Sequence, residues 1–169
     1  MGLLVLGIDP GTKFIGYGLI HVEKSCCRAI DYGFFRIDNK AAFPERLKQI
    51  HEVIFDLLDQ TRPDVVAVEE VYVSRNAKTT LRLGHARGVI LLAAVEKGVP
   101  VAEYAAREVK QAVIGRGGAS KEQVQWMMAR MLNIRLDGLQ EDAADGLAVA
   151  LCHGLRNSRY TAQVQKVEE

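Results

Sequence analysis

The first 38 residues show apolar patterns that predict three β-strands lying side by side. Residues 3–9 form a nearly continuous apolar run, which is typical of a strand buried on both faces. Residues 14–23 and about 28–38 read as two further strands, and Pro10-Gly11 provides the first turn. Because the connections are short, the three strands are expected to form an antiparallel meander.

Beyond the meander, helical and strand-like patterns alternate along the chain. A period of 3.6 residues indicates amphipathic helices, while short apolar runs indicate buried strands. Helices are expected at 44–61, about 76–97, 107–113 and 141–156 and from Ser120 onward, and strands are expected at 64–70 and 99–105. The segment VILLAAV at 89–95 is apolar around its whole circumference, which predicts either deep burial or a subunit interface.

These elements predict a mixed α/β sheet flanked by helices. The strand at 3–9 is apolar on both faces and therefore needs a neighbour on each side. Its second neighbour is most simply the strand at 64–70, placed parallel by a crossover, so the expected strand order is 3-2-1-4-5. One domain over residues 1–157 accounts for the patterning, and the polar residues 158–169 are expected to form a flexible tail.

Composition narrows the class of protein without identifying its function. Of the 169 residues, 49% are hydrophobic and 25% are charged, which is ordinary for a globular protein. No apolar run reaches the ~18 residues of a membrane span, and the apolar N-terminus is expected to be a core strand rather than a signal peptide. The three cysteines and four histidines show neither a Cys-x-x-Cys pair nor zinc spacing, which favours reduced thiols in the cytoplasm.

The net charge of +1 hides an uneven distribution of charged residues. Between Val71 and Lys121, nine basic residues stand against three acidic ones, so this segment carries +6 and the rest of the chain −5. Two interpretations stay open at this point. The segment is either a phosphate-binding face beside a metal site or a set of solvated helix faces.

Four carboxylates are expected to converge at one edge of the predicted sheet. Asp9 and Glu69 stand at the C-terminal ends of two neighbouring parallel strands, where open α/β sheets place their ligands. Asp142 and Asp145 lie three residues apart on one face of the last helix. That face continues through Val149 as the apolar, inward face, where an unpaired carboxylate at Asp145 would be costly.

Each acid also has an ordinary structural interpretation. Asp9 could be a turn residue, and Glu69 or Glu70 could be a solvated strand end. Asp142 could favour the positive end of its helix. Four nearby carboxylates, however, raise each other's pKa, and a divalent cation relieves their repulsion. Oxygen-only ligands favour Mg²⁺ or Mn²⁺ over zinc, and two such ions about 3.5–4 Å apart can act on a phosphodiester.

Several segments of the chain resemble one known family. They are GIDPGT at 7–12, VEEVY at 68–72, LGHARGVILLAAV at 83–95, EYAAREVKQAVIGRGGASKEQVQ at 103–125 and EDAADGLAVALCH at 141–153. Together they resemble the RuvC-type Holliday junction resolvases of bacteria over about residues 3–156. The resemblance implies a ribonuclease-H-like fold, which agrees with the strand order expected from the patterning.

The resemblance also implies an activity, that of a Mg-dependent crossover junction endodeoxyribonuclease in recombination and DNA repair. Its two Mg²⁺ ions, which Mn²⁺ can replace, would be held by Asp9, Glu69, Asp142 and Asp145, with Glu70 as a neighbour. Some members carry His at the third acid position, where this chain has Asp142. Members nick four-way junction DNA in pairs as homodimers, alongside a branch-migration motor complex in the bacterial cytoplasm.

Six further residues are candidates for DNA contact. By position, Lys110 and Lys121 match family lysines near the scissile phosphate, where Lys121 would assist catalysis, and Tyr72 matches an aromatic residue on a junction-contacting loop. Lys121 also follows a glycine-rich loop at a helix start, where backbone N–H groups attract phosphate. Without the resemblance, Lys121 would read as an exposed lysine and Tyr72 as a packed strand end. The remaining candidates are Arg75, Asn76 and Arg116, of which the first two could instead cap the following helix.

The homodimer interface is expected on the long helix at 76–97. Its apolar circumference exceeds what a helix with one covered face requires. Gly84 and Gly88, four residues apart, would permit close approach of a partner. The alternative is that the helix is covered by its own subunit.

Two other functions compete with the nuclease. The segment from Asp9 to Thr12 also resembles the phosphate loop of actin- and sugar-kinase-type phosphotransferases, but those proteins need two lobes and leave Asp142 and Asp145 without a role. A non-catalytic junction-binding scaffold would not retain four acids against a phosphate polyanion. ATP binding would favour the first alternative, and Mg²⁺-dependent nicking of a four-way junction separates the nuclease from the second.

Overall fold

The structure, a computed structural model, describes residues 2–24, 26–73 and 75–165, with the backbone alone for 158–165. Its elements in chain order are β1 Leu3–Asp9, β2 Phe14–Glu23, β3 Cys26–Arg36, α1 Phe43–Thr61, β4 Val65–Glu69, α2 Ala77–Glu96, β5 Val101–Tyr104, α3 Ala106–Ile114, α4 Lys121–Leu132 and α5 Glu141–Gln165. No helix in this described part of the chain is long and apolar enough to cross a membrane.

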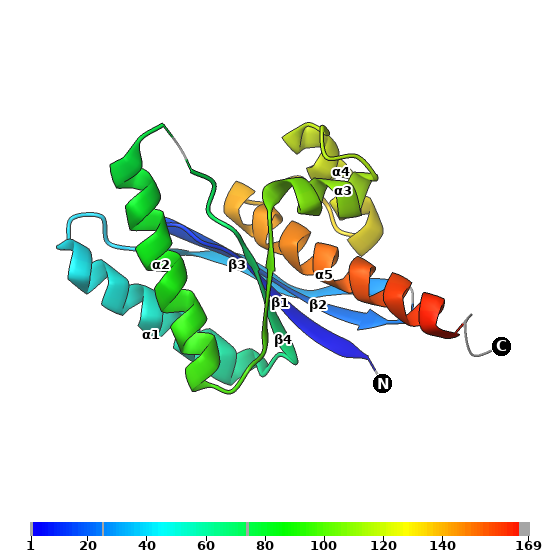
Figure 1. Cartoon of the computed structure of the whole chain (residues 1–169), viewed down its shortest axis with the longest axis horizontal. Coiled ribbons are helices and arrows are strands. Elements are labelled where there is room, and N and C mark those ends of the chain that lie inside the picture. The colour runs from blue at the N-terminus through cyan, green and yellow to red at the C-terminus, as the bar shows by residue number, and fades with distance from the viewer. Residues whose placement is uncertain (1, 25, 74, 166–169) are drawn as a thin grey trace.

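The five strands form one sheet in the order β3-β2-β1-β4-β5, which confirms the predicted order. β1 pairs antiparallel with β2 and parallel with β4, and β4 pairs parallel with β5. Helices α1 and α2 cover one face of the sheet, and α3, α4 and α5 cover the other (Figure 1).

The apolar run in β1 is explained by the two helical layers. Val5 points into the core beneath α3, α4 and α5, while Leu6 and Ile8 point into the core beneath α1 and α2. All three side chains are fully buried. A strand flanked on both faces has no polar side to show, as the sequence pattern predicted.

The strand and helix boundaries differ from the predicted ones at a few positions. β3 begins two residues early because Cys26 pairs directly with Glu23 of β2. It ends at Arg36 because Asp38 leaves the sheet, with its N–H donating to the Gln49 side chain and its carboxylate accepting from the Lys40 N–H. α5 continues to Gln165, past the predicted end at 156, so the backbone of 158–165 is helical and only 166–169 of the expected tail lie outside the described residues.

Helix α5 crosses the sheet at very short range because glycines line the contact. A Cβ atom added at Gly16 would lie 1.7 Å from the Asp142 carbonyl oxygen, and one at Gly7 would lie 2.2 Å from the Gly146 carbonyl oxygen. In turn, a Cβ at Gly146 would lie 2.6 Å from the backbone of Tyr17. Only glycine permits this approach, which sets the height of α5 above the strands.

Helix α2 is covered on one face only, so of the two alternatives predicted for VILLAAV, deep burial is not observed and an interface stays a prediction. Ile90, Ala93 and Ala94 are buried against the subunit's own core, whereas Leu92 and Val95 are exposed. The physical reason is that α2 packs against α1 and the sheet from one side, and nothing in the described chain lies over its outer side.

Candidate active site

Asp9 and Glu69 meet at the carboxyl-terminal edge of the sheet, as the topology predicted. Ile8 of β1 is in register with Val68 of β4, so the next residue of each strand emerges at the same level. A side-chain hydrogen bond joins the two carboxyl groups. Parallel strands thus bring together two acids that are sixty residues apart in the chain.

The amino-terminal turn of α5 adds Asp142 and Asp145 to this edge. The helix begins at Glu141, directly above Gly16, which pairs with Asp9 across β1 and β2. The charges of Asp142 and Asp145 both act on the carboxyl group of Asp9. The structure therefore brings all four predicted acids into one cluster, and Glu70 lies outside it as an exposed neighbour.

Burial and mutual repulsion raise the pKa values of this cluster. Burial, followed by the charge of Glu69, raises the pKa of Asp9 to about 9. Burial also raises the pKa of Glu69, although its hydrogen bond with Asp9 opposes the shift. Burial likewise raises the pKa of Asp145, although the hydrogen bond from Lys121 opposes the shift. Such a cluster favours a bound cation or a retained proton over four bare charges.

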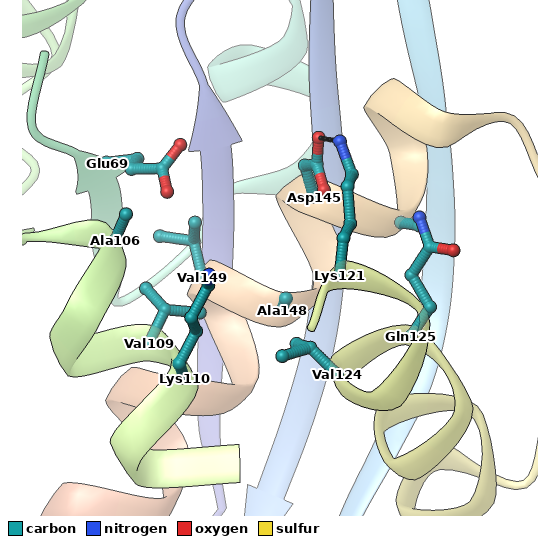
Figure 2. Close-up of a pocket in the computed structure, with 11 residues that line it drawn as sticks. Glu69, Ala106, Val109, Lys110, Lys121, Val124, Gln125, Asp145, Ala148 and Val149 are labelled. Atoms are coloured by element: carbon teal, nitrogen blue, oxygen red, sulfur yellow. Dashed lines mark hydrogen bonds and ion pairs between the residues drawn. The ribbon is translucent and has the colours of Figure 1, made fainter. Parts of the chain in front are cut away.

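Lys121 at the start of α4 supplies one positive charge to the cluster. Its Nζ lies 2.9 Å from Asp145 Oδ2 (Figure 2). The same Nζ also forms an ion pair with Glu141. Burial disfavours the charged amine, but the hydrogen bonds to Glu141 and Asp145 outweigh it and raise the pKa of Lys121. Ser120 caps α4 and accepts from the Gln123 N–H, as the sequence predicted, and so fixes where Lys121 leaves the helix.

A pocket of about 210 Å³ opens between the acids and the two predicted lysines. Figure 2 shows Glu69 on one side of it, with Asp145 and Lys121 on the other. Lys110 of α3 lies on its rim, and the positive charges of Lys110 and Lys121 both act on Glu69. The floor is apolar and is formed by Val109, Val124 and Val149 among others. An anionic group in this pocket would face both amines.

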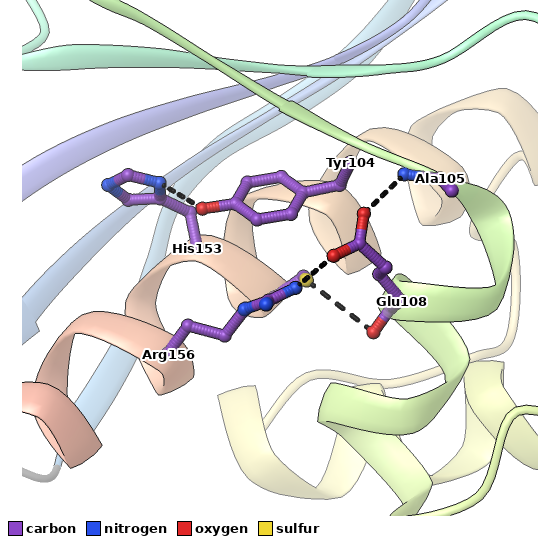
Figure 3. Close-up of polar contacts among 6 residues, drawn as sticks. Tyr104, Ala105, Glu108, His153 and Arg156 are labelled. Carbon is purple, nitrogen blue, oxygen red and sulfur yellow. Dashed lines mark hydrogen bonds and ion pairs between the residues drawn. The ribbon is translucent and has the colours of Figure 1, made fainter.

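Polar contacts fix α3, and hence Lys110, to α5 (Figure 3). Glu108 accepts from the Ala105 N–H at 2.9 Å, which caps the first turn of α3, and pairs with Arg156 of α5 at 2.5 Å. Beside them, the Tyr104 hydroxyl and His153 Nδ1 are hydrogen-bonded at 2.8 Å. Lys110 and Asp145 are therefore held on helices that are joined to each other.

A buried arginine holds the loop that follows Asp9, and the sequence interpretation did not identify it. Arg46 of α1 is buried, and its Nη2 donates to the carbonyl oxygen of Thr12. Within the described residues its Nε has no hydrogen-bond partner. The available signal was its position in the apolar stripe of α1, four residues before Ile50, which is unusual for an arginine.

The other predicted DNA contacts are exposed and lie between β4 and α2 or between α3 and α4. Tyr72 is 85% exposed, so the alternative that it packs as a strand end is not observed. Asn76 does cap α2, because its side chain accepts from the Thr79 N–H at 3.2 Å. Arg75 and Arg116 are exposed, and Arg116 contacts the Gln123 side chain at 3.5 Å. Contact of these residues with DNA stays a prediction.

The donor set fits a hard divalent cation better than zinc. All four clustered donors are carboxylates, the ligands that Mg²⁺ and Mn²⁺ prefer. Among the described residues, no three His, Cys, Asp or Glu side chains already converge as one set of metal ligands. Lys121 pairs with Asp145 instead, which shows that this position accepts a cation.

The raised pKa of Asp9 predicts how stability depends on pH and Mg²⁺. Because its pKa is about 9 when folded and about 3.8 otherwise, the folded chain holds a proton that the unfolded chain lacks between these values. Stability without divalent ions should therefore fall as pH rises from about 4 to 9. We expect the melting temperature in EDTA to fall over this window and Mg²⁺ to restore it most strongly at the alkaline end.

Two variants test the origin of this pH dependence. Asp9→Asn removes the titrating group, so its melting temperature in EDTA should be higher than wild type at pH 8 and flatter with pH. Glu70→Gln removes an exposed neighbouring carboxylate and should leave the wild-type curve unchanged. A wild-type melting temperature that rises steadily towards pH 9 in EDTA would contradict the burial of a proton at Asp9.

Comparisons with known sequences place these residues in a family context. Residues 5–153 match the family described as Crossover junction endodeoxyribonuclease RuvC. The protein of that name from Magnetococcus marinus is 46% identical over 149 residues, covering 88% of this chain and 82% of the relative. The protein of that name from Granulibacter bethesdensis is 49% identical over 159 residues, covering 94% and 88%.

Solved structures give the same result for the fold. A Thermus thermophilus RuvC structure superposes with a TM-score of 0.85 at 35% identity, covering 94% of this chain and 97% of that one. A second structure, of T. thermophilus RuvC in complex with a Holliday junction substrate, has a TM-score of 0.83 at 32% identity, covering 92% and 96%. The ribonuclease-H-like fold expected from the sequence is thereby confirmed.

Proposed function

Since the chain belongs to the RuvC family of crossover junction endodeoxyribonucleases, which resolve Holliday junctions, we propose that Asp9, Glu69, Asp142 and Asp145 carry its chemistry by holding two Mg²⁺ ions. When bound by these carboxylates, such ions, or Mn²⁺ in their place, would supply the activation of water and the neutralisation of the leaving oxygen that phosphodiester hydrolysis requires. Membership of an endonuclease family also argues against the kinase-type phosphotransferase and the non-catalytic scaffold.

One observation carries this proposal. Three of the four acids are half-buried at one sheet edge with raised pKa values, and the one cation they contact among the described residues is Lys121. Carboxylates held partly away from water lower the stability of the fold unless a positive ligand compensates their charge. A divalent ion bound there would remove the repulsion that raises the pKa of Asp9.

Lys121 and Lys110 are proposed to hold the scissile phosphate in the pocket. Lys121 Nζ already lies beside Asp145, so a phosphate oxygen that enters the pocket meets its charge at short range. Lys110 reaches the same space from α3 and opposes the charge of Glu69. Both amines would stabilise the negative charge that grows on the phosphate during hydrolysis.

Tyr72 is proposed to stack on a base beside the junction's branch point. Its side chain is 85% exposed, and stacking on an unpaired base is worth about 1–3 kcal/mol. We expect Tyr72→Ala to bind and cut a mobile junction about five-fold or more weakly, with an unchanged melting temperature. Tyr72→Phe, which keeps the ring, is the control and should retain most of the rate.

A junction already unpaired at the nick site gives a second test of Tyr72. It should recover much of the rate of Tyr72→Ala, because the energy of opening the pair is then supplied by the substrate. A large loss of melting temperature without any recovery would show instead that Tyr72 supports the fold.

We also propose a homodimer formed through the outer face of α2. Leu81, Leu92 and Val95 are exposed on it, and a shallow groove of about 600 Å³ runs along Gly84 and Gly88. A Cβ added at either glycine would meet nothing within 4 Å, so a partner helix can approach closely. A two-fold dimer would present two copies of the carboxylate cluster to the two equivalent strands of a junction.

The setting of this activity is proposed from the substrate. A resolvase acts on chromosomal DNA, which supports the expected bacterial cytoplasm, and the described Cys26, Cys27 and Cys152 are free thiols. A branch-migration motor complex is the proposed partner that delivers junctions to it.

The activity itself is tested with a synthetic mobile four-way junction. Each strand is labelled in turn, and the protein is added with Mg²⁺ or with EDTA. We expect nicks on two opposed strands with Mg²⁺ and none in EDTA. Nicks that persist in EDTA would contradict the metal-dependent mechanism while leaving the family assignment untouched.

A further inference from the structure

One row of residues crosses the whole sheet at the level of the active site. Glu69 of β4 is in register with Tyr104 of β5, and Asp9 of β1 is in register with Gly16 of β2. Gly16 in turn pairs with Phe34 of β3. Paired residues on neighbouring strands point to the same face, so Phe34 lies on the α5 face two strands from Asp9.

Phe34 belongs to a group of exposed aromatic side chains on that face. Phe14, Tyr32 and Phe34 are 40%, 40% and 39% exposed, although aromatic residues at such a position usually pack under a helix. The rings of Phe14 and Phe34 contact edge to face, with centroids 5.8 Å apart. Clustered exposed rings of this kind mark a binding surface more often than isolated ones do.

A cation completes this surface. Arg36 is the register partner of Phe14, so its side chain leaves the sheet on the same face, and it is exposed. Within the described residues Arg36 has no ion-pair partner. The combination of exposed rings with a free guanidinium fits a nucleic acid strand, whose bases stack on rings and whose phosphates pair with arginine.

The surface also lies at the same edge of the sheet as the carboxylate cluster. β3 and β2 run so that Phe34, Arg36 and Phe14 stand at the same sheet edge as Asp9. Two strand spacings separate Phe34 from Asp9 at about 4.8 Å each, which makes about 10 Å. This distance corresponds to about three base steps of 3.4 Å along one DNA strand.

We propose that Phe14, Tyr32, Phe34 and Arg36, here called the β2–β3 aromatic surface, bind junction DNA about three nucleotides from the nick. Phe34, with Phe14 behind it, stacks on a base that has left its pair, and Arg36 contacts the adjacent phosphate. The inference rests on the proposed position of the nick beside Asp9. Because Tyr72 follows β4 and this surface lies on β2 and β3, the two stacking sites stand on opposite sides of β1 and Asp9, and the nicked strand is held on both sides of the carboxylate cluster.

β3 is an edge strand, so a strand from another protein could in principle pair with it, but its own geometry disfavours this. The register of β3 shifts between the residues that pair with Leu19 and Ile20, so that Ile30 is an extra, unpaired residue. Such a bulge interrupts the ladder of hydrogen-bonding groups that an added strand would need. The aromatic residues are therefore expected to act through their faces rather than through the backbone of β3.

Binding affinity measured without cleavage tests the surface directly. Fluorescence anisotropy in EDTA, with a labelled four-way junction, reports DNA binding whether or not the carboxylates bind Mg²⁺. We expect Phe34→Ala to weaken binding by about five-fold or more, the effect of one lost base stack. Phe34→Leu should bind as weakly as Phe34→Ala because it keeps apolar bulk but has no ring. Arg36→Gln should lower the slope of binding against salt by about one.

Matched controls separate the surface from general effects on the fold. Ile30→Ala changes an exposed apolar residue of the same strand at a greater distance from Asp9, and it should bind the junction like wild type. A 2-aminopurine base placed three nucleotides from the nick should be quenched by wild type and recover its fluorescence with Phe34→Ala.

Two results would overturn the inference. The first is unchanged affinity and unchanged quenching for folded Phe34→Ala and Phe14→Ala. The second is unchanged DNA binding together with altered sedimentation of the protein, which would make the surface a contact between protein chains. Loss of Mg²⁺-dependent nicking with normal junction binding would instead point to a failure of the proposed metal site.

Discussion

Asp9→Asn is expected to abolish junction cleavage almost completely while leaving the fold and DNA binding intact. Asp9 lies at the centre of the cluster, hydrogen-bonded to Glu69 and within the field of Asp142 and Asp145. Loss of one ligand removes several kcal/mol of transition-state stabilisation, which corresponds to about 10³-fold or more in rate. Glu69→Gln, Asp142→Asn and Asp145→Asn should show the same loss in single-turnover cleavage with Mg²⁺.

Glu70→Gln is the matched control for this series. Glu70 adjoins Glu69 in the chain, but it is exposed and lies outside the cluster, so its loss should change the rate less than two-fold. Junction affinity in EDTA should be unchanged for Asp9→Asn, because the folded protein already holds a proton there, and equal to or higher than wild type for the other acid variants, because a negative charge leaves a phosphate-binding face. A folded Asp9→Asn protein that cuts at near the wild-type rate would show that Asp9 binds no catalytic metal.

Leu92→Lys is expected to convert the proposed dimer into a folded monomer. Leu92 is 53% exposed in the single subunit, so a lysine there adds no buried charge to the monomer. In a dimer formed through α2, the same lysine would bury an unpaired charge at the interface, which is strongly unfavourable. Sedimentation at micromolar concentration should show a monomer, and junctions should receive single nicks in place of paired ones.

An exposed apolar residue elsewhere supplies the control for the dimer. Met131 of α4 is 38% exposed, and Met131→Lys should leave both the dimer and the paired nicks unchanged. If Leu92→Lys sediments like wild type, the interface lies on another face of the subunit. If Leu92→Lys unfolds, α2 is covered by its own subunit in a way that the exposure of Leu92 does not show.

The meeting of the carboxylates at one edge of the sheet could be predicted from the sequence because two simple rules determine it. The apolar run at 3–9 required neighbours on both sides of β1, and this placed β4 beside it. Asp9 and Glu69 then had to emerge together from adjacent parallel strands. The i, i+3 spacing of Asp142 and Asp145 on an inward helix face supplied the other half of the cluster.

Features that depend on side-chain reach could not be predicted in the same way. The contact of Arg46 with the Thr12 carbonyl joins residues 34 positions apart. An arginine in an apolar stripe does not by itself indicate which group it contacts. The pairing of Lys121 with Glu141 and Asp145 depends on how α4 is placed against α5. Periodicity shows which face of a helix is apolar, but it does not show which neighbour a long side chain reaches.

The exposed side of α2 illustrates a further limit of patterning. VILLAAV is apolar all round, and this predicted burial and an interface equally well. In the subunit Ile90 and Ala93 are buried while Leu92 and Val95 are exposed. When apolar residues surround a helix on all sides, the sequence does not show which side faces the subunit's own core. Only the tertiary structure distinguishes burial within the subunit from an exposed face.

The most direct test of the central claim is a count of metal ions in the carboxylate cluster. Crystals of the protein with a nuclease-resistant four-way junction and Mn²⁺ would show the ions by anomalous diffraction. We expect two peaks in each subunit, enclosed by Asp9, Glu69, Asp142 and Asp145 and in contact with the scissile phosphate. Peaks outside this cluster, or none at all with the junction seated in the pocket, would contradict the account.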